Sequence, residues 1–380
     1  MHAVFRTLFS WLQWLWHALS MLVAAPVWYA CYRSALLHCE NGVTRNIVYS
    51  THQSRAGKPQ KLDVYSQLDG PQKRFRSPVV VFVHGGAWSS GCKAMYAFVG
   101  RFFQSLGFVC VLPNFSRYPE GDVRDMISDL DVCMAWVLRE INAYGGDPEN
   151  IHLIGHSSGA HLTSLLLVFH LCRLAEVKPG SYDRVHLERT LEECAIPFSP
   201  MEAHEPGPHA DPDHWIHRVR TFFGLCGVYD IYDHYDHECY RCVEMLSPME
   251  RTMLGQDRFL DFSPTFWLSC NSFCYNPETV PRPPAFRLVH GGKDITVPCK
   301  ASDKFTKMYS RWKGSNQDVK LRHYYQFGHT DMMYTLIKRQ LRKFNAKWIT
   351  HPLSPASIQG EVVLWDHVVD TMLQVAPERF

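Results

Sequence analysis

The ten residues from Ile151 to Ala160, IHLIGHSSGA, constrain this chain more than any other stretch. They contain the pattern G-x-S-x-G with Ser157 at its centre, after an apolar run and before a helix-like segment. This order is typical of a sharp strand-to-helix turn that exposes a nucleophilic serine, and Gly155 and Gly159 avoid steric collisions on either side of it. Because the pattern also occurs by chance in ordinary loops, the hypothesis depends on other stretches of the chain.

A second stretch lies directly after an expected buried strand. Residues 77–84, SPVVVFVH, form an apolar run without polar breaks, which is typical of a strand buried on both faces. The run ends in HGGAW, and such a glycine loop leaves backbone N–H groups uncovered that in hydrolases bind an oxyanion. We therefore expect Gly85, Gly86 and Ala87, together with the N–H of Ser158, to form an oxyanion and substrate-binding loop. An ordinary glycine turn is the alternative interpretation.

Two later strands end in polar residues of the types that such a serine needs. The strand 286–290 leads into GGKD and thus to Asp294, and the strand 319–325 leads into QFGHTD and thus to His329. Open α/β sheets hold their sites at the carboxyl ends of strands, and the order Ser, Asp, His is that of the α/β-hydrolase triad. We predict His329 as the general base and Asp294 as the acid that orients it, with Asp331 as the next candidate for the acid.

The remaining periodicities predict alternating strands and helices around this triad. With 46% hydrophobic residues among 380, one large α/β domain with an appendage fits as well as two domains. The expected fold is an α/β-hydrolase fold with a central, mostly parallel sheet and helices on both faces. Further expected elements are a hairpin over 47–66, strands over 108–115 and 221–229, and helices over 123–141 (capped by Asp122), 160–174 and 332–348.

The segment from Thr7 to Tyr32 has 26 residues without Asp, Glu, Lys or Arg. Roughly 20 apolar residues cross a bilayer, so we expect a hydrophobic anchor helix within residues 1–40. Gln13, Pro26 and several tryptophans leave two alternatives open, a helix in the membrane interface and a buried helix of the fold. A cleaved signal peptide has a shorter apolar run of roughly 7 to 15 residues.

Residues 41–350 form the expected catalytic domain. Within it, residues 173–220 are rich in Pro, His, Glu and Asp, which predicts a surface insertion that is partly disordered and has little apolar material to bury. Residues 230–285 are expected to form a cap-like segment over the pocket. Their His, Asp and Cys side chains offer metal ligands, but the one C-x-x-C has no second pair at matching spacing, so we expect neither a metal nor a cofactor. The tail, 351–380, contains an amphipathic patch over 362–375 with no evident role.

Four stretches resemble a known family: VVVFVHGGAW, YGGDPENIHLIGHSSGAHL, HGGKDITVP and FGHTDM. They are similar to the eukaryotic prenylcysteine (isoprenylcysteine) alpha-carboxyl methylesterases, on the hormone-sensitive-lipase-like side of the α/β hydrolases, over roughly residues 47–345. The resemblance implies triad roles for Ser157, Asp294 and His329, and a methyl ester on a farnesylated or geranylgeranylated cysteine as the substrate. It also implies an N-terminal membrane segment. Residues 114–119, NFSRYP, and the long insertion depart from the family pattern and put the substrate in doubt.

Other functions remain open at this stage. Arylformamidases of the kynurenine pathway share HGGAW and the triad order, and would hydrolyse N-formylkynurenine. A membrane-anchored deacetylase of lipid or sterol esters is a further alternative, whereas a purely ligand-binding protein of this fold would have lost a triad member. The net charge of +2 gives no reason to expect nucleic acid as a partner.

The expected location is the endoplasmic reticulum or Golgi membrane with the catalytic domain facing the cytosol. Lys and Arg are more frequent after the apolar segment than before it, and the side richer in them usually stays cytosolic. Thirteen irregularly spaced cysteines also favour a reducing compartment, without excluding a disulfide or two. The expected partners are the membrane, through the N-terminal segment, and, as the family resemblance implies, an ester with a hydrophobic prenyl group.

Overall fold

The computed structural model describes eight segments of the chain. They are residues 42–50, 57–67, 76–175, 182–196, 215–270, 283–312, 318–336 and 364–372. The anchor expected at 7–32 lies outside them. Within these segments, no helix has both the length and the apolar character to cross a membrane.

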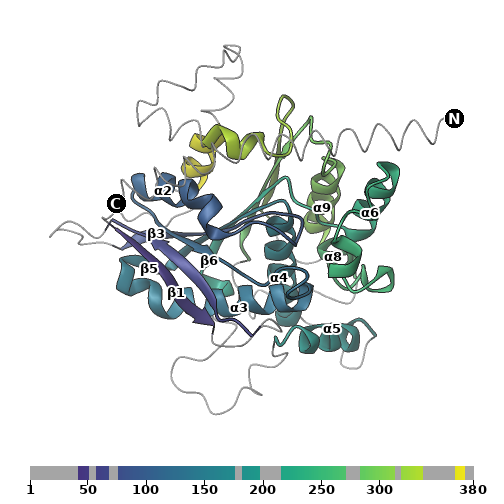
Figure 1. The fold of residues 1–380 in the computed structure, drawn as a ribbon, viewed down its shortest axis with the longest axis horizontal. Coiled ribbons are helices and arrows are strands. Elements are labelled where there is room, and N and C mark those ends of the chain that lie inside the picture. Colours follow the sequence, from purple (N-terminus) through teal and green to yellow (C-terminus); the bar gives the residue numbers. More distant parts are fainter. Residues whose placement is uncertain are drawn as a thin grey trace.

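Within the described residues, eight strands form one sheet in the order β1-β2-β4-β3-β5-β6-β7-β8 (Figure 1). The strands are β1 (Val43–Ser50), β2 (Gln60–Tyr65), β3 (Ser77–Val83), β4 (Val109–Pro113), β5 (Gly146–His156), β6 (Val219–Leu225), β7 (Ala285–Gly291) and β8 (Val319–Tyr324). β1 and β2 form the predicted antiparallel hairpin, and β2 is also antiparallel to β4. All other neighbours are parallel, so β3, β5, β7 and β8 end at the same edge of the sheet.

Helices lie on both faces of this sheet, as predicted. They are α2 (Ala97–Ser105), α3 (Val123–Glu140), α4 (Ser158–Leu174), α5 (Tyr182–Glu193), α6 (Ile231–Tyr240), α7 (Met249–Thr252), α8 (Pro264–Ser269) and α9 (Lys300–Arg311). Short 3₁₀ turns are η1 (Lys93–Tyr96), η2 (Ile141–Tyr144), η3 (Ile216–Arg218) and η4 (Gln256–Arg258). Residues 331–336 and 364–372 are also helical.

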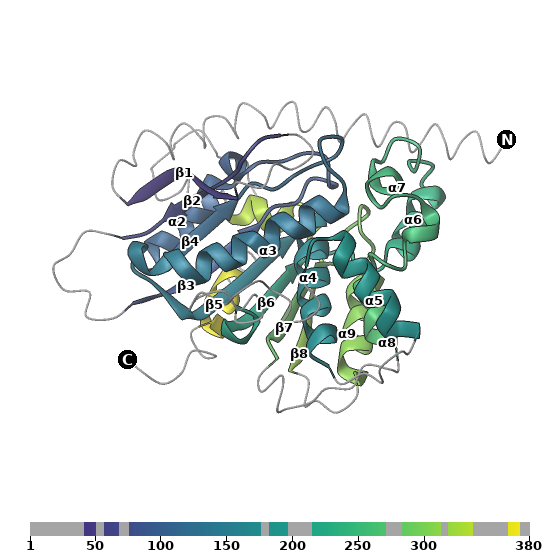
Figure 2. The ribbon, with the colours of Figure 1, turned by 90° about the horizontal axis from the view of Figure 1, so that it is seen from below.

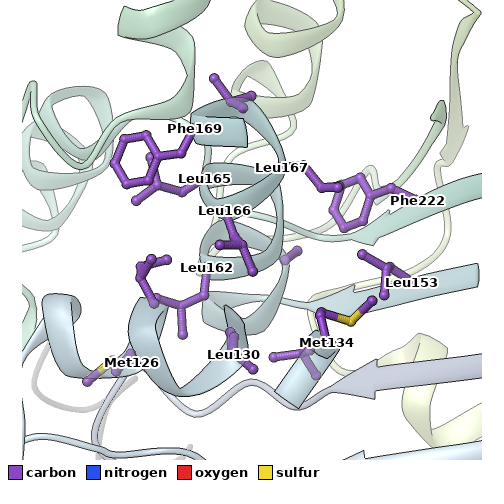
Figure 3. Close-up of a cluster of buried hydrophobic side chains, with 14 of the residues drawn as sticks. Met126, Leu130, Met134, Leu153, Leu162, Leu165, Leu166, Leu167, Phe169 and Phe222 are labelled. Carbon is purple, nitrogen blue, oxygen red and sulfur yellow. The ribbon is translucent and has the colours of Figure 1, made fainter. Parts of the chain in front are cut away.

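The larger core lies between the sheet and the layer that contains α3 and α4 (Figure 2). Alternate residues of each strand face it, as Val79 and Val81 of β3 do, because side chains alternate across a pleated strand. Figure 3 shows side chains of α4 gathered with Leu130 and Met134 of α3 and with Phe222 of β6. Burial of these apolar groups fixes α4, and with it the turn at its first residue.

The second core lies on the opposite face and explains the C-terminal amphipathic patch. Val80 and Phe82 of β3 face this core, which is covered by α2 and by the helical residues 331–336 and 364–372. The indole of Trp365 packs edge-on against Phe102 of α2 at 5.7 Å, and its N–H donates to the carbonyl of Met332 at 3.2 Å. The C-terminal patch thus closes one face of the catalytic domain.

The expectation for residues 173–220 was wrong in one respect, because part of this segment is an ordered helix with a buried side. Leu187 and Leu191 of α5 are fully buried and belong to the larger core. Two leucines four residues apart make a narrow apolar stripe, which the surrounding charged residues hide in the composition. Residues 176–181 and 197–214 lie outside the description.

The predicted N-cap of α3 is confirmed. The side chain of Asp122 accepts the N–H of Arg124 at 2.9 Å, and the side chain of Asp125 accepts the N–H of Asp122 at 2.9 Å. This reciprocal pair is a capping box, which satisfies donors that the first helical turn leaves without partners.

Candidate active site

Ser157 lies in the sharp turn between β5 and α4 that the sequence predicts. Its backbone has φ 55° and ψ −123°, a combination that non-glycine residues rarely adopt and that is held here by the strand and the helix on either side. A Cβ added to Gly155 would lie 2.5 Å from the Cα of Ala160, and one added to Gly159 would lie 2.3 Å from the carbonyl oxygen of Val83. Both glycines are therefore required by close approach of the backbone.

The structure brings together the three side chains that the sequence singled out. His329 Nε2 lies 2.8 Å from Ser157 Oγ, and His329 Nδ1 lies 2.7 Å from Asp294 Oδ2. The serine follows β5, the aspartate follows β7 and the histidine follows β8, so all three lie at the carboxyl edge of the sheet. A hydrogen-bonded chain of this kind lets the imidazole take the serine proton while the carboxylate fixes its tautomer.

Asp294 is held as a carboxylate. Its Oδ1 accepts the N–H groups of Thr296 and Val297, both at 2.9 Å. Burial raises the pKa of Asp294, but interaction with His329 and the hydrogen bonds to its oxygens outweigh burial and hold that pKa well below its usual range. The alternative acid, Asp331, instead accepts the N–H of Gly328 at 2.6 Å and so shapes the turn before His329.

Two further histidines support the triad, and the sequence indicated neither role. His156 Nε2 donates to the carbonyl of His329 at 3.1 Å, and burial, followed by the nearby His329, lowers the pKa of His156 to about 3. His290 Nε2 lies 2.9 Å from the carbonyl of Val297 and 3.3 Å from Asp294 Oδ2. Both residues directly precede catalytic loops, which is the only local signal that the sequence offered.

The HGG loop lies directly against the serine. A Cβ on Gly85 would lie 2.9 Å from Ser157 Cβ, and Gly86, Ala87 and Trp88 all have positive φ. The Gly86 carbonyl accepts the N–H groups of two later residues of the loop, Ser89 at 3.1 Å and Ser90 at 2.9 Å.

The donors that the sequence assigned to the oxyanion are not used elsewhere. In the part of the chain that the structure describes, no hydrogen bond has the N–H of Gly86, Ala87 or Ser158 as its donor. Ser158 is the first residue of α4, where an N–H has no acceptor within the helix and the helix dipole favours negative charge. These N–H groups are therefore free to bind an anionic oxygen.

A contact that the sequence did not predict links this loop to the helix behind the serine. The Trp88 indole N–H donates to His161 Nδ1 at 3.1 Å, and His161 Nε2 donates to the carbonyl of Phe262 at 2.7 Å. Burial lowers the pKa of His161 to about 4, so the ring stays neutral and keeps both roles. The sequence could not predict this contact, because the two residues are 73 positions apart, although each belongs to a distinctive motif.

The unusual segment NFSRYP at 114–119 packs on the same loop. The N–H of Tyr118 donates to the carbonyl of Trp88 at 2.9 Å, and Arg117 bonds the carbonyl of Gly91. Asn114 Oδ1 accepts the N–H of Lys93 at 2.7 Å. The departure from the family pattern therefore lies beside the expected oxyanion donors.

Among the described residues, the side chains of the 230–242 cluster do not converge on a metal-like site. Asp230 caps α6 and binds Thr265 at 2.6 Å and Lys304 at 2.7 Å. The one group of described residues with converging ligand atoms is Cys226, His290 and Asp294, within 4.8 Å of one another. Since Asp294 already contacts His329, this group belongs to the surroundings of the triad.

Residues 62–309 match the BD-FAE family model. The chain is 30% identical over 294 residues to a probable isoprenylcysteine alpha-carbonyl methylesterase of Oryza sativa, covering 76% of this chain and 58% of that protein. It is 29% identical to the isoprenylcysteine alpha-carbonyl methylesterase of Arabidopsis thaliana (70% and 52%) and 27% identical to the esterase LipQ of Mycobacterium tuberculosis (66% and 49%). The chain thus spans about half the length of these relatives. The resemblance to the methylesterases is confirmed.

Solved esterase structures have the same fold. Esterase 2 of Thermogutta terrifontis with bound butyrate matches with a TM-score of 0.51 and 15% identity, covering 82% of this chain and 97% of that chain. Esterase B of Lactobacillus rhamnosis matches with a TM-score of 0.58 and 14% identity, covering 94% and 96%. The predicted α/β-hydrolase fold is confirmed.

Proposed function

Because the chain belongs to the BD-FAE family of the α/β-hydrolase superfamily, we propose that it is a serine carboxylesterase with Ser157 as its nucleophile. The observation that carries this proposal is the hydrogen-bonded chain from Asp294 through His329 to Ser157, placed against a glycine loop with free N–H groups. Esterase names among the relatives support the same reaction class.

The proposed reaction has two halves. Ser157 Oγ attacks the ester carbonyl carbon while His329 Nε2 takes the hydroxyl proton, and the N–H groups of Gly86, Ala87 and Ser158 bind the oxyanion that forms. The bond to the alcohol then breaks, and His329 gives its proton to the leaving oxygen. Water, deprotonated by His329, attacks the acyl-enzyme and releases the carboxylic acid and the serine.

For the substrate, we propose the methyl ester of a prenylcysteine alpha-carboxyl group. The support is the similarity to proteins named isoprenylcysteine methylesterases, together with the apolar segment at 7–32. Such an ester has its prenyl chain in the bilayer, and a tethered enzyme would meet it at the membrane surface. We therefore also propose a catalytic domain that faces the cytosol from the endoplasmic reticulum or Golgi.

The nucleophile is tested with a fluorophosphonate probe, which labels the serine of an active triad. We expect Ser157→Ala to abolish labelling without loss of the folded state, as judged by thermal unfolding. Ser158→Ala is the matched control, because it keeps the backbone N–H, and it should still be labelled. Labelling that persists in Ser157→Ala would refute the assignment.

The substrate is tested by comparing kcat/KM on three compounds, namely a prenylcysteine methyl ester, a short-chain aryl acetate and N-formylkynurenine. We expect the prenylcysteine ester to be the preferred substrate. Preference for N-formylkynurenine would instead identify an arylformamidase. Preference for the aryl acetate would favour a lipid or sterol ester deacetylase.

A further inference from the structure

One face of α6 carries polar side chains that the proposed reaction does not use. His234, His237, Glu238 and Arg241 occupy positions i, i+3, i+4 and i+7 of this helix and its C-cap, so they share one side. Asp233, Asp236, Cys239 and Tyr240 point away and are exposed. Figure 2 shows α6 and α7 together at the end of the molecule away from β1.

This face of α6 touches both loops that build the site. The ring of His234 lies edge-on to the ring of Trp88 at 6.2 Å, and Trp88 belongs to the loop that lies against Ser157. His237 Nε2 donates to the carbonyl of Ile295 at 2.9 Å, and Ile295 follows the catalytic Asp294. α6 therefore bridges the oxyanion loop and the acid loop.

Glu238 lies on the same side, because its Oε1 is 3.5 Å from Nε2 of His234, whose ring packs against Trp88. Burial lowers the pKa of Arg241, and the negative charges of Glu238 and Asp294 act on this pKa in the opposite direction. Glu238 and the triad consequently share one region of the molecule.

The carboxylate of Glu238 has one oxygen engaged and one unengaged. Oε1 is the oxygen that faces His234. Oε2 is shielded from solvent and has no hydrogen-bond partner among the described residues, and Glu238 is only 8% exposed. A buried carboxylate oxygen without a donor costs free energy, so a donor from outside the chain would be bound favourably there.

We propose that Glu238 binds an N–H group on the α-carbon of the ester, so that the enzyme is selective for esters of α-amino acids. This rests on the proposed function, in which the ester carbonyl lies at Ser157. In a cysteine ester the α-nitrogen is two bonds from the carbonyl carbon, and it carries an N–H both in the free amino acid and in a peptide. Glu238 is thus a specificity-determining residue, and His234 is the residue that positions its carboxylate.

The test compares two esters that differ only in the acetamido group on the α-carbon, which supplies the N–H and which the second ester lacks. They are N-acetyl-S-farnesylcysteine methyl ester and methyl 3-(farnesylthio)propanoate, each assayed with the full-length wild type, Glu238→Leu and the exposed control Asp236→Asn. The loss of a hydrogen bond to a charged group corresponds to a decrease in kcat/KM of about 10-fold to 100-fold. We expect Glu238→Leu to lower kcat/KM by this factor for the cysteine ester and by less than about 2-fold for the propanoate.

The control variant should match the wild type on both esters. Equal losses on the two esters in Glu238→Leu would overturn the inference and leave the proposed esterase function intact, because α6 would then act only through packing. If the wild type turned over neither ester nor an aryl acetate, both the inference and the proposed function would fail. Glu238→Gln, which keeps the shape and an acceptor oxygen, should fall between wild type and Glu238→Leu.

Discussion

At the scale of single residues, each triad member sits in a position that its neighbours determine. Asp294 illustrates this, because two backbone N–H groups and His329 bind its oxygens and hold its pKa well below the usual range. In Asp294→Asn the side chain keeps its shape but loses its charge, which favours the wrong histidine tautomer.

We expect Asp294→Asn to lower kcat by about 10⁴-fold with little change in KM, and His329→Ala to have a similar effect. The measurement is steady-state hydrolysis of an aryl acetate. Asp331→Asn is the comparison, since among the described residues the Asp331 carboxylate hydrogen-bonds only to the N–H of Gly328. If Asp294→Asn retained near wild-type kcat and Asp331→Asn did not, the acid would have been assigned wrongly.

Much of the site could be predicted because its residues follow strands in local motifs. Ser157 and Asp294 each come after a mostly apolar run, His329 comes after the alternating strand β8, and parallel strands end at one edge. The pairing of Trp88 with His161 and the buried face of α6 could not be predicted, because these contacts join residues distant in sequence by geometry that only packing decides.

At the scale of helices and strands, the sequence could predict features that depend on neighbouring residues, such as helix periodicity and helix capping. The helix predicted over 123–141 is α3, one residue shorter, and Asp122 caps it as expected. α5 was missed because two buried leucines are too few to mark a helix among charged residues. The sequence also could not predict which face of the sheet each helix covers. Both faces are buried, and each takes alternate residues of the same strands.

The α3 cap supports a prediction about stability. Asp122→Ala removes a side-chain acceptor from the first turn, so we expect a loss of about 1 kcal/mol in the free energy of unfolding, measured by urea denaturation. Asp122→Asn should restore most of it, because an amide oxygen still accepts the N–H of Arg124. A loss in Asp122→Asn as large as in Asp122→Ala would show that the ion pair with the Arg124 side chain matters more than the cap.

At the scale of the whole molecule, several buried histidines make stability depend on pH. Burial is the main cause that lowers the pKa of His84 and His161 to about 4 and of His152 and His156 to about 3. In the unfolded chain these rings take up protons near pH 6.5. The unfolded state therefore binds more protons below that pH, and the native state loses stability as the pH falls.

We expect the free energy of unfolding to drop between pH 6.5 and pH 5, by up to about 1.4 kcal/mol per pH unit for each such histidine. Urea denaturation at several pH values measures this slope. His152→Leu should make the slope shallower by the uptake of about one proton. Within the described segments, the His152 ring has a side-chain hydrogen-bond partner only in Thr221, at 3.3 Å. A stability that does not change over this range would contradict the burial of neutral rings.

The proposed membrane tether is also a property of the whole chain. Deletion of Met1 to Tyr32 should move the protein from the membrane fraction to the soluble fraction. It should also reduce activity on a bilayer-embedded prenylcysteine ester more than on a water-soluble aryl ester. The reason is that the enzyme would no longer be held at the membrane surface that contains the prenylcysteine ester. Protection of the intact catalytic domain from protease outside sealed microsomes would contradict the cytosolic orientation.

The hydrogen bond from Trp88 to His161 has a consequence for motion. It joins the HGG loop to α4, the helix that follows the serine, so we expect the fluctuations of these two parts to be correlated. Asp294 and His329 stand on loops after β7 and β8, which lie farther from β5 in the sheet, and His329 contacts the serine hydroxyl through its side chain. Thermal agitation should therefore separate the base from the nucleophile before it separates the nucleophile from its anion-binding amides. Such a molecule would lose its proton transfer first while it could still bind a negatively charged inhibitor.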